Sequence, residues 1–103
     1  MTLIALLSVA PVIEDSMAQE VAAAVDALDA HNVSYETNPM GTVIEADDID
    51  TLLAAVADAH NAVDADRVST VLKIDDKRAS DETAAEKVEA VENVLGREAR
   101  GDD

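Results

Sequence analysis

The sequence predicts an α+β fold of the ferredoxin-like type, a βαββαβ sandwich with an additional C-terminal helix. Apolar β-prone runs occupy residues 3–11 and 67–75, and two segments of helical periodicity lie between them. A proline–glycine turn at residues 39–41 joins two further short runs. Strands and helices in this order form the sandwich when the crossovers are right-handed. The 103 residues make one domain, which we assign to residues 1–96, followed by a polar, flexible tail at residues 97–103.

The first strand is predicted at Leu3–Pro11, an apolar run that proline ends and that is too short for a buried helix. A helix follows from Ser16, which would form a capping box with Gln19. We expect this helix to end at Asn32, because asparagine tolerates the left-handed conformation after a helix. Its apolar positions recur at helical spacing, at Met17, Val21, Ala24, Val25 and Leu28.

A hairpin is predicted next, with strands at Val33–Asn38 and Thr42–Ala46 and a turn at Pro39–Gly41. Asp48 then caps a second helix, because its carboxylate can accept a hydrogen bond from a free N–H of the first turn. The expected apolar stripe of that helix is Ile49, Leu52, Leu53, Val56, His60 and Val63.

The last strand is predicted at Arg67–Asp75, where side chains alternate between two faces. One face carries Val68, Thr70, Leu72 and Ile74, and the other carries Ser69, Val71, Lys73 and Asp75. A third helix begins at Thr83, with Glu86 completing a capping box. The residues that this helix is expected to bury are Ala84, Val88, Val91 and Leu95.

The second face of the predicted sheet lacks a cover, because both crossover helices pack on the first. It would expose Ile4, Leu6, Val43 and Val71, which is much apolar surface for a soluble chain. Self-association is the simplest solution, with the third helix or another subunit's sheet covering the face. We therefore expect a homodimer or homotetramer.

The net charge of −16 arises from 23 acidic and seven basic residues spread along the chain. Such a field repels phosphates, so neither nucleic acid nor an anionic membrane is expected as a partner. The distributed acidity also favours a halophilic protein, in which salt screens the self-repulsion. Folding that is independent of salt in dilute buffer would contradict that hypothesis.

No cysteine is present, which excludes disulfides and thiolate metal sites and fits a cytoplasmic protein. The apolar N-terminal run lacks basic residues and is shorter than the roughly 20 residues that span a bilayer, so it is interpreted as a strand. No spacing of nucleophile and base typical of a catalytic site occurs, so the sequence predicts that the protein is not an enzyme.

Several polar residues have a structural and a functional interpretation. His31 and His60 are isolated and are most simply packed or capping imidazoles, so no metal site is expected. Asp47, Asp48 and Asp50 favour the positive end of a helix dipole over a cation loop. The acid–acid–base–base cluster at residues 75–78 is most simply a solvated loop, although Asp75 with Glu45 could hold a cationic ligand. The hydroxyls of Ser8 and Thr37 are ligand donors or, more commonly, backbone-satisfied groups.

Five segments carry a resemblance to the YkoF-like thiamine-binding proteins, over about Leu3 to Leu95. They are LIALLSVAPV, YETNPMGTVIEA, DALDAHNV, AVADAHNAV and VLKIDDKR. The acidic surface departs from the family's more mixed charge, and Asn32 stands where a glycine is usual. The resemblance implies a ferredoxin-like fold, dimers or tetramers, and binding of thiamine or its hydroxymethylpyrimidine portion for carriage, salvage or sensing, without catalysis or a cofactor.

The resemblance also implies site residues. The hairpin residues that match the family's motif are Thr37, Asn38, Met40, Gly41, Thr42 and Glu45, and Asp75 matches the strand exit. Glu45 or Asp75 would oppose the positive thiazolium ring, Asn38 and Thr37 would contact the pyrimidine, and Met40 would pack on a ring. Two alternatives remain: a structural or regulatory oligomeric module with another small-molecule ligand, and an enzyme on a thiamine precursor that uses Glu45 or His60.

Overall fold

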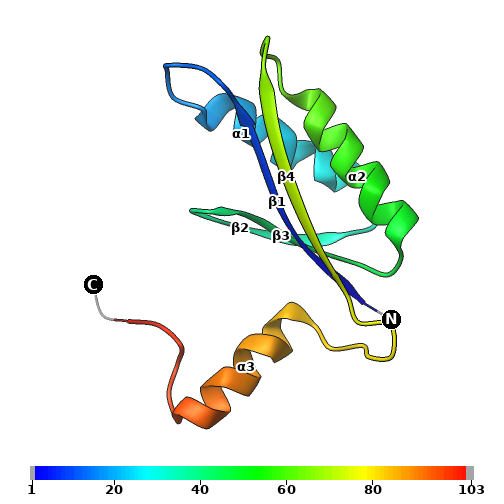
Figure 1. Ribbon diagram of the computed structural model, residues 1–103, viewed down its shortest axis with the longest axis vertical. Coiled ribbons are helices and arrows are strands. Elements are labelled where there is room, and N and C mark those ends of the chain that lie inside the picture. Colours follow the sequence, from blue (N-terminus) through cyan, green and yellow to red (C-terminus); the bar gives the residue numbers. More distant parts are fainter. Residues whose placement is uncertain (1, 102–103) are drawn as a thin grey trace.

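The computed structural model describes residues 2–101; Met1 and residues 102–103, at the ends of the predicted domain and tail, lie outside it. The elements follow one another in the predicted order (Figure 1). They are β1 (Leu3–Pro11), α1 (Ala18–Ala27), the 3-10 turn η1 (Leu28–Ala30), β2 (Ser34–Asn38), β3 (Gly41–Ala46), α2 (Ile49–Ala62), β4 (Val68–Asp76) and α3 (Ala84–Leu95).

The four strands form one antiparallel sheet in the order β2-β3-β1-β4, which confirms the predicted ferredoxin-like fold. The central strand β1 pairs with β4 along its whole length, from Leu3 to Pro11. Its pairing with β3 is shorter and runs only from Leu3↔Ala46 to Leu7↔Thr42. On the β3 side, the end of β1 therefore continues past the β2–β3 hairpin with no paired strand.

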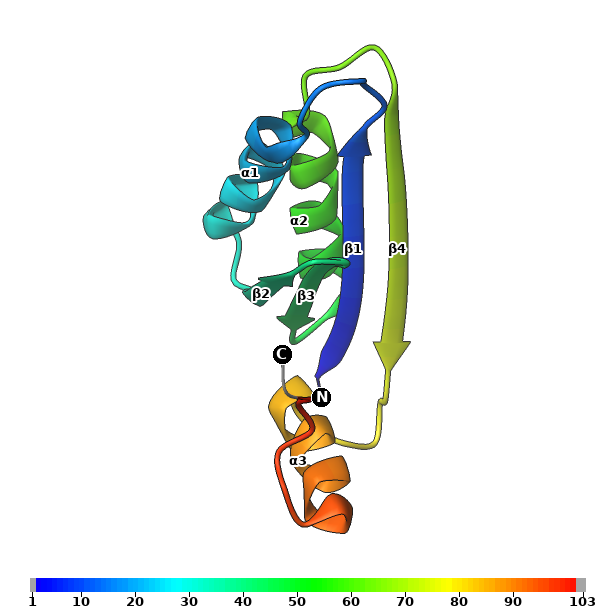
Figure 2. The same cartoon turned by 90° about the vertical axis from the view of Figure 1, so that its left-hand side faces the viewer.

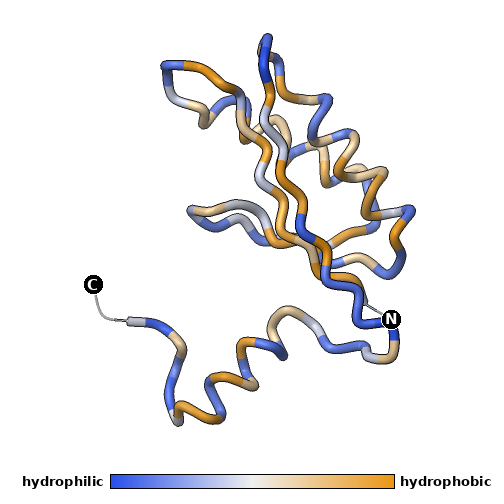
Figure 3. Tube along the Cα trace, in the orientation of Figure 1, coloured by the Kyte–Doolittle hydropathy of each residue, from blue (hydrophilic) through white to orange (hydrophobic). Residues whose placement is uncertain are grey.

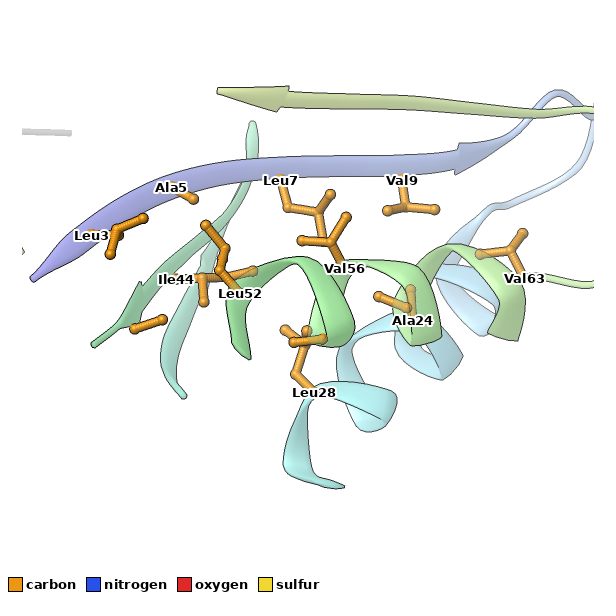
Figure 4. Packing of buried hydrophobic residues seen from close by; sticks show 13 residues of the cluster. Leu3, Ala5, Leu7, Val9, Ala24, Leu28, Ile44, Leu52, Val56 and Val63 are labelled. Carbon is orange, nitrogen blue, oxygen red and sulfur yellow. The ribbon is translucent and has the colours of Figure 1, made fainter. Parts of the chain in front are cut away.

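The hydrophobic core lies between the sheet and the helices α1 and α2, which cover the same sheet face (Figure 2). Alternate residues of β1 point toward these helices (Figure 4), as the twofold period of a strand requires. The buried residues of β1 and β3 are Leu3, Ala5, Leu7, Val9, Ile44 and Ala46. Those of the helical layer are Ala24, Leu28, Leu52, Ala55, Val56, Ala59 and Val63. Because alanines lie on the buried side of α2, this helix can approach the sheet closely.

The first helix begins differently from the prediction. Its N-cap is Met17, which makes no capping hydrogen bond through its side chain, so the expected capping box of Ser16 and Gln19 is wrong. The Ser16 hydroxyl instead accepts a hydrogen bond from the Ala18 N–H, 3.3 Å away, in a local turn. The helix also ends earlier, in η1, and His31 already has an extended backbone before Asn32.

The second helix confirms its predicted cap. Asp48 accepts the Thr51 N–H at 2.7 Å and the Thr51 hydroxyl at 3.0 Å, and the backbone hydrogen bond lowers the pKa of the Asp48 carboxyl. The predicted stripe is only partly right, because its members Ile49, Leu53 and His60 are exposed. The buried positions follow a narrower helical repeat that includes Ala55 and Ala59.

The third helix lies apart from the sandwich and extends from the end of the sheet (Figures 1 and 2). Its Thr83–Glu86 capping box is confirmed, with reciprocal hydrogen bonds of 3.2 and 3.3 Å, and Gly96 ends it in the left-handed conformation. No residue of α3 is buried, so the predicted burial of Ala84, Val88, Val91 and Leu95 is wrong for a single chain. The cause is the 77–83 segment, which leads the helix away from the sheet.

Both histidines join elements at the surface. His31 Nε2 lies 2.5 Å from Asp58 Oδ2 on α2, and His60 Nδ1 lies 2.5 Å from the Thr70 hydroxyl on β4. Within residues 2–101, no three histidine or acidic side chains are grouped so that they could bind a metal ion. None of the helices in that range is long and apolar enough to cross a membrane.

Candidate ligand-binding site

A cavity of about 150 Å³ lies between the end of β1, the helix α1 and the β2–β3 hairpin. We call it the hairpin cavity. Strand residues 7–10 and hairpin residues 37–42 form one side. The other side is apolar and consists of Met17, Val21, Ala24, Val25 and Leu28. Mostly apolar walls with a few polar groups are typical of small-molecule sites.

Six of the eight residues predicted to bind a ligand line this cavity. They are Ser8, Thr37, Asn38, Met40, Gly41 and Thr42. Ser8 contributes its backbone, because its side chain alternates to the other sheet face with those of Ile4 and Leu6. The cavity therefore combines the hairpin predicted from the sequence with the adjoining end of β1.

Two threonine hydroxyls lie side by side in the hairpin. Thr37 and Thr42 are directly paired across β2 and β3, and their Oγ1 atoms are 3.0 Å apart. Thr42 is buried, with 5% of its surface exposed. Each hydroxyl is one donor and two acceptors, so their mutual hydrogen bond leaves one proton and further lone pairs for a ligand.

The backbone of Val9 adds a donor and an acceptor beside these hydroxyls. A Cβ atom on Gly41 would lie 2.8 Å from the Leu7 carbonyl oxygen, which places the backbone groups of Leu7 on the β3 side. Residues of an antiparallel strand direct these groups to alternate sides, so the N–H and C=O of Val9 face the same way. Since the pairing with β3 ends at Leu7, they open into the hairpin cavity.

The turn of the hairpin forms the rim of the cavity. The Asn38 side-chain oxygen accepts the Met40 N–H at 2.9 Å, which leaves the Asn38 amide N–H groups available as donors. Met40 is 80% exposed and is the most solvent-accessible of the large apolar residues that line the cavity. Gly41 has φ +154°, a conformation that side chains disfavour, and it allows the hairpin to approach β1.

Glu45 and Asp75, the two predicted partners of a cationic ring, do not line the hairpin cavity. Both are paired with Ile4, on either side of β1, and their side chains lie on the sheet face that the helices leave uncovered. Glu45 Oε1 accepts the Ala84 N–H at 3.1 Å, and Asp75 forms a salt bridge with Lys87. The structure thus places both carboxylates at the first turns of α3.

The Asp75–Lys87 salt bridge gives this attachment a pH dependence. The hydrogen bond from the Lys87 ammonium lowers the pKa of the Asp75 carboxyl, and the same hydrogen bond raises the pKa of Lys87. The stabilisation from Asp75 is complete above its unfolded pKa of about 3.9 and is lost as the pH falls through the lowered folded value. That from Lys87 is complete below about 10.4 and is lost as the pH rises through the raised folded value.

We expect NMR titration of Asp75 to give a midpoint below the ordinary aspartate value. In a Lys87→Met variant the midpoint should return toward that value, because the donated hydrogen bond and the opposite charge are removed. Hydrogen-exchange protection of α3 should fall in strong acid before that of β1 does. An Asp75 midpoint that Lys87→Met leaves unchanged would contradict the salt bridge.

The sequence interpretation missed the apolar wall from α1 and the backbone of Val9. The sequence predicts the wall residues only as the apolar stripe of an amphipathic helix, and three of the five, Met17, Val21 and Val25, are not fully buried. That the backbone of Val9 is unpaired on the β3 side could have been predicted from the lengths of the predicted strands. A nine-residue strand beside a shorter hairpin strand leaves part of its edge unpaired.

A comparison with family models matches residues 5–92 to the family described as thiamine-binding protein. A UPF0045 protein of Methanothermobacter thermautotrophicus is 49% identical over 83 residues, which cover 78% of this chain and 84% of that protein. Another UPF0045 protein, from Methanocaldococcus jannaschii, is 37% identical over 78 residues, or 74% of this chain and 77% of the relative.

Solved structures share the fold. A crystal structure of a hypothetical protein from Methanocaldococcus jannaschii has a TM-score of 0.80 and 34% identity, over 87% of this chain and 95% of that one. A Thermotoga maritima protein provisionally assigned to thiamine biosynthesis or salvage has a TM-score of 0.76 and 22% identity, over 88% of this chain and 99% of the other. At 22% identity, the similarity to the Thermotoga maritima protein shows a shared fold only.

Proposed function

The chain belongs to the thiamine-binding protein family, and we propose that it binds the aminopyrimidine ring of thiamine, or of free hydroxymethylpyrimidine, in the hairpin cavity. The observation that carries this proposal is an apolar cavity lined by both the Thr37–Thr42 hydroxyl pair and Val9, where β1 is no longer paired with β3. The protein would act in carriage, salvage or sensing of the ligand and would not convert it.

The polar groups of the cavity suit an aminopyrimidine. This ring is flat and neutral, and its edge alternates ring-nitrogen acceptors with an exocyclic amino donor. A backbone N–H and C=O on one strand residue offer the complementary donor and acceptor, and the threonine hydroxyls can adapt to either role. The apolar wall of α1, with Val21 and Val25, would contact the face of the ring.

Size and charge favour one ring over the whole vitamin inside the cavity. A volume of about 150 Å³ is small beside the roughly 300–1,000 Å³ of pockets for drug-sized ligands. Among residues 2–101 no carboxylate lines the cavity, so the positive thiazolium ring would lack a partner there and would pay a desolvation cost. We therefore propose that the thiazolium ring of bound thiamine extends past Met40 toward solvent.

The arrangement favours binding over turnover. The two groups considered as acid or base are not in the hairpin cavity: His60 bonds Thr70 on the far strand, and Glu45 accepts the Ala84 N–H. General acid–base catalysis requires such a group within hydrogen-bonding reach of the reacting atom. This placement supports a binding protein.

Calorimetric titration with three ligands tests the proposal. We expect hydroxymethylpyrimidine and thiamine to bind with affinities within about tenfold of each other, a difference of roughly 1.4 kcal/mol, because both present the same ring. The isolated hydroxyethylthiazole half should bind much more weakly. Absence of heat and of a thermal shift with millimolar pyrimidine, or tighter binding of the thiazole half, would overturn the proposal.

We also propose that the protein self-associates, as a dimer or tetramer, through the face of the sheet opposite the helices. We call this the open sheet face and define it by Ile4, Leu6, Val43 and Val71. Val71 is 62% exposed and Leu6 37% exposed, and contiguous apolar surface of this kind marks interaction sites. Sedimentation velocity would measure the stoichiometry, and a monomer at all concentrations would contradict it.

A further inference from the structure

We propose that copies of the chain exchange their C-terminal helices, so that α3 of one copy packs on the open sheet face of a second copy. The contacting residues of α3 form a stripe, the α3 stripe, which consists of Val88, Val91 and Leu95. This inference rests on the proposed self-association and specifies its geometry. It concerns the opposite side of the sheet from the hairpin cavity.

The chain carries two apolar surfaces that residues 2–101 cover only in part. On α3, Val88, Val91 and Leu95 recur at helical spacing and are each about half exposed, Val91 at 54%. Figure 3 shows hydrophobic and hydrophilic stretches alternating along this helix. On the sheet, the open sheet face is exposed at its centre and along β4. A 12-residue helix is marginal in water without tertiary packing, so the α3 stripe needs a partner.

The first turns of α3 are held at the end of their own sheet. Ala84 N–H donates to Glu45 on β3, and Lys87 pairs with Asp75 on β4. The segment before the helix has its own hydrogen bonds, from Ser80 N–H to the Lys77 carbonyl at 3.0 Å and from Glu82 N–H to the Ser80 hydroxyl at 3.1 Å.

From this attachment α3 runs away from its own sheet (Figures 1 and 2). The contacts with Glu45 and Asp75 hold only the first turns of α3 at one end of its own sheet, and to cover the rest of its own open sheet face the helix would have to take another direction after these turns. A second copy related by a twofold axis can bring its open sheet face to the helix with these contacts intact. Such an interface is self-complementary, as closed homodimers require.

Length and charge fit the same arrangement. A 12-residue helix is about 18 Å long, and the β1 segment from Ile4 to Ala10 spans roughly 20 Å. Lys73 lies on the open sheet face, paired with Leu6, and makes no salt bridge within residues 2–101. Glu92 lies one turn beyond Val88 and borders the α3 stripe. Its Oε2 atom accepts the Ala99 N–H at 2.9 Å, and its carboxylate has further lone pairs with which it can meet the opposite charge at the edge of the contact.

Disulfide trapping tests the exchange, and no native cysteine can form a competing disulfide, because the chain has none. A Val71→Cys/Val91→Cys double variant is oxidised mildly and run on a non-reducing gel. Exchange predicts a covalent dimer, because each sheet cysteine meets the helix cysteine of the other copy. A matched Ala57→Cys/Val91→Cys variant, with its first cysteine on an exposed position of α2, should remain largely uncross-linked.

The outcomes separate this inference from the proposals on which it rests. Intramolecular bridging that yields an oxidised monomer, or no bridging in a chain that sediments as an oligomer, overturns the exchange and leaves self-association standing. A chain that sediments as a monomer overturns both. Ligand titration is a separate readout, since the apolar wall and the threonine hydroxyls of the hairpin cavity lie on the helix side of the sheet.

A second variant keeps the test decisive if cysteines perturb folding. Val91→Asp places a charge in the α3 stripe and should weaken association at least tenfold, with unchanged circular dichroism of the sandwich and unchanged affinity for hydroxymethylpyrimidine. Glu89→Gln, on another side of the same helix, should leave association within about twofold. Equal association of both variants and the parent chain overturns the exchange.

Discussion

Replacement of Gly41 by alanine is expected to lower the free energy of unfolding by roughly 1–3 kcal/mol and to weaken ligand binding. The backbone at Gly41 has φ +154°, which a residue with a Cβ atom rarely adopts. The added Cβ would also lie 2.8 Å from the Leu7 carbonyl oxygen, and a backbone atom cannot move aside as a flexible side chain can. The hairpin must therefore shift away from β1, which separates Thr42 from Val9.

Urea unfolding measures the first effect as a lower transition midpoint with an unchanged slope, because the surface exposed on unfolding stays the same. Titration with hydroxymethylpyrimidine measures the second. Gly101→Ala is the matched control, since no atom of the described part of the chain lies within 4 Å of a Cβ atom there, and it should change neither quantity. A Gly41→Ala protein as stable as its parent would show that the hairpin does not depend on this close approach.

The hairpin illustrates which parts of the fold the sequence can predict. Its turn follows from local chemistry, because Pro39 and Gly41 favour a reversal between two β-prone runs. The tight contact of Gly41 with Leu7 is not local, since 34 residues separate the two positions, and it depends on the register of β1 and β3. The sequence therefore predicts that a glycine stands in a turn but gives no sign of what it touches.

The alternation of strand residues was predictable, whereas the partner of α3 was not. Hydrophobic periodicity correctly assigned the two faces of β4 and the apolar open sheet face. The same signal identified a stripe on α3 but could not say whether the stripe packs within the chain, and the expected intramolecular burial is wrong. On α2 the buried Ala55 and Ala59 escaped notice, because small side chains carry little hydrophobic signal.

The candidate site divides in the same way. The resemblance pointed to the hairpin, and the structure brings its threonines together at the hairpin cavity. The charged candidates Glu45 and Asp75 follow from the match to the family's motif and from their charge, neither of which takes strand parity into account. Thr42 and Glu45 are three residues apart in one strand, so their side chains lie on opposite faces of the sheet. Once the bounds of β3 are known, the sequence alone shows which of its residues share a face of the sheet.

A Val21→Trp variant is expected to lose at least roughly 100-fold in affinity for hydroxymethylpyrimidine, about 2.7 kcal/mol of binding free energy. Val21 belongs to the apolar wall of the hairpin cavity and is partly exposed, so a larger side chain can extend into the existing space. The indole would occupy the volume assigned to the pyrimidine ring. Because it fills a cavity and does not overpack the core, the free energy of unfolding should change by less than about 1.5 kcal/mol.

Calorimetry measures the loss, and the chain's lack of tryptophan makes the indole a direct reporter of its own position. Its emission should be blue-shifted relative to that of Ala22→Trp, a control on an exposed position of the same helix, which should retain the parent affinity. If Val21→Trp showed buried emission and yet bound hydroxymethylpyrimidine as tightly as the parent, the ligand would have to bind elsewhere. The hairpin cavity would then be a packing feature between α1 and the sheet.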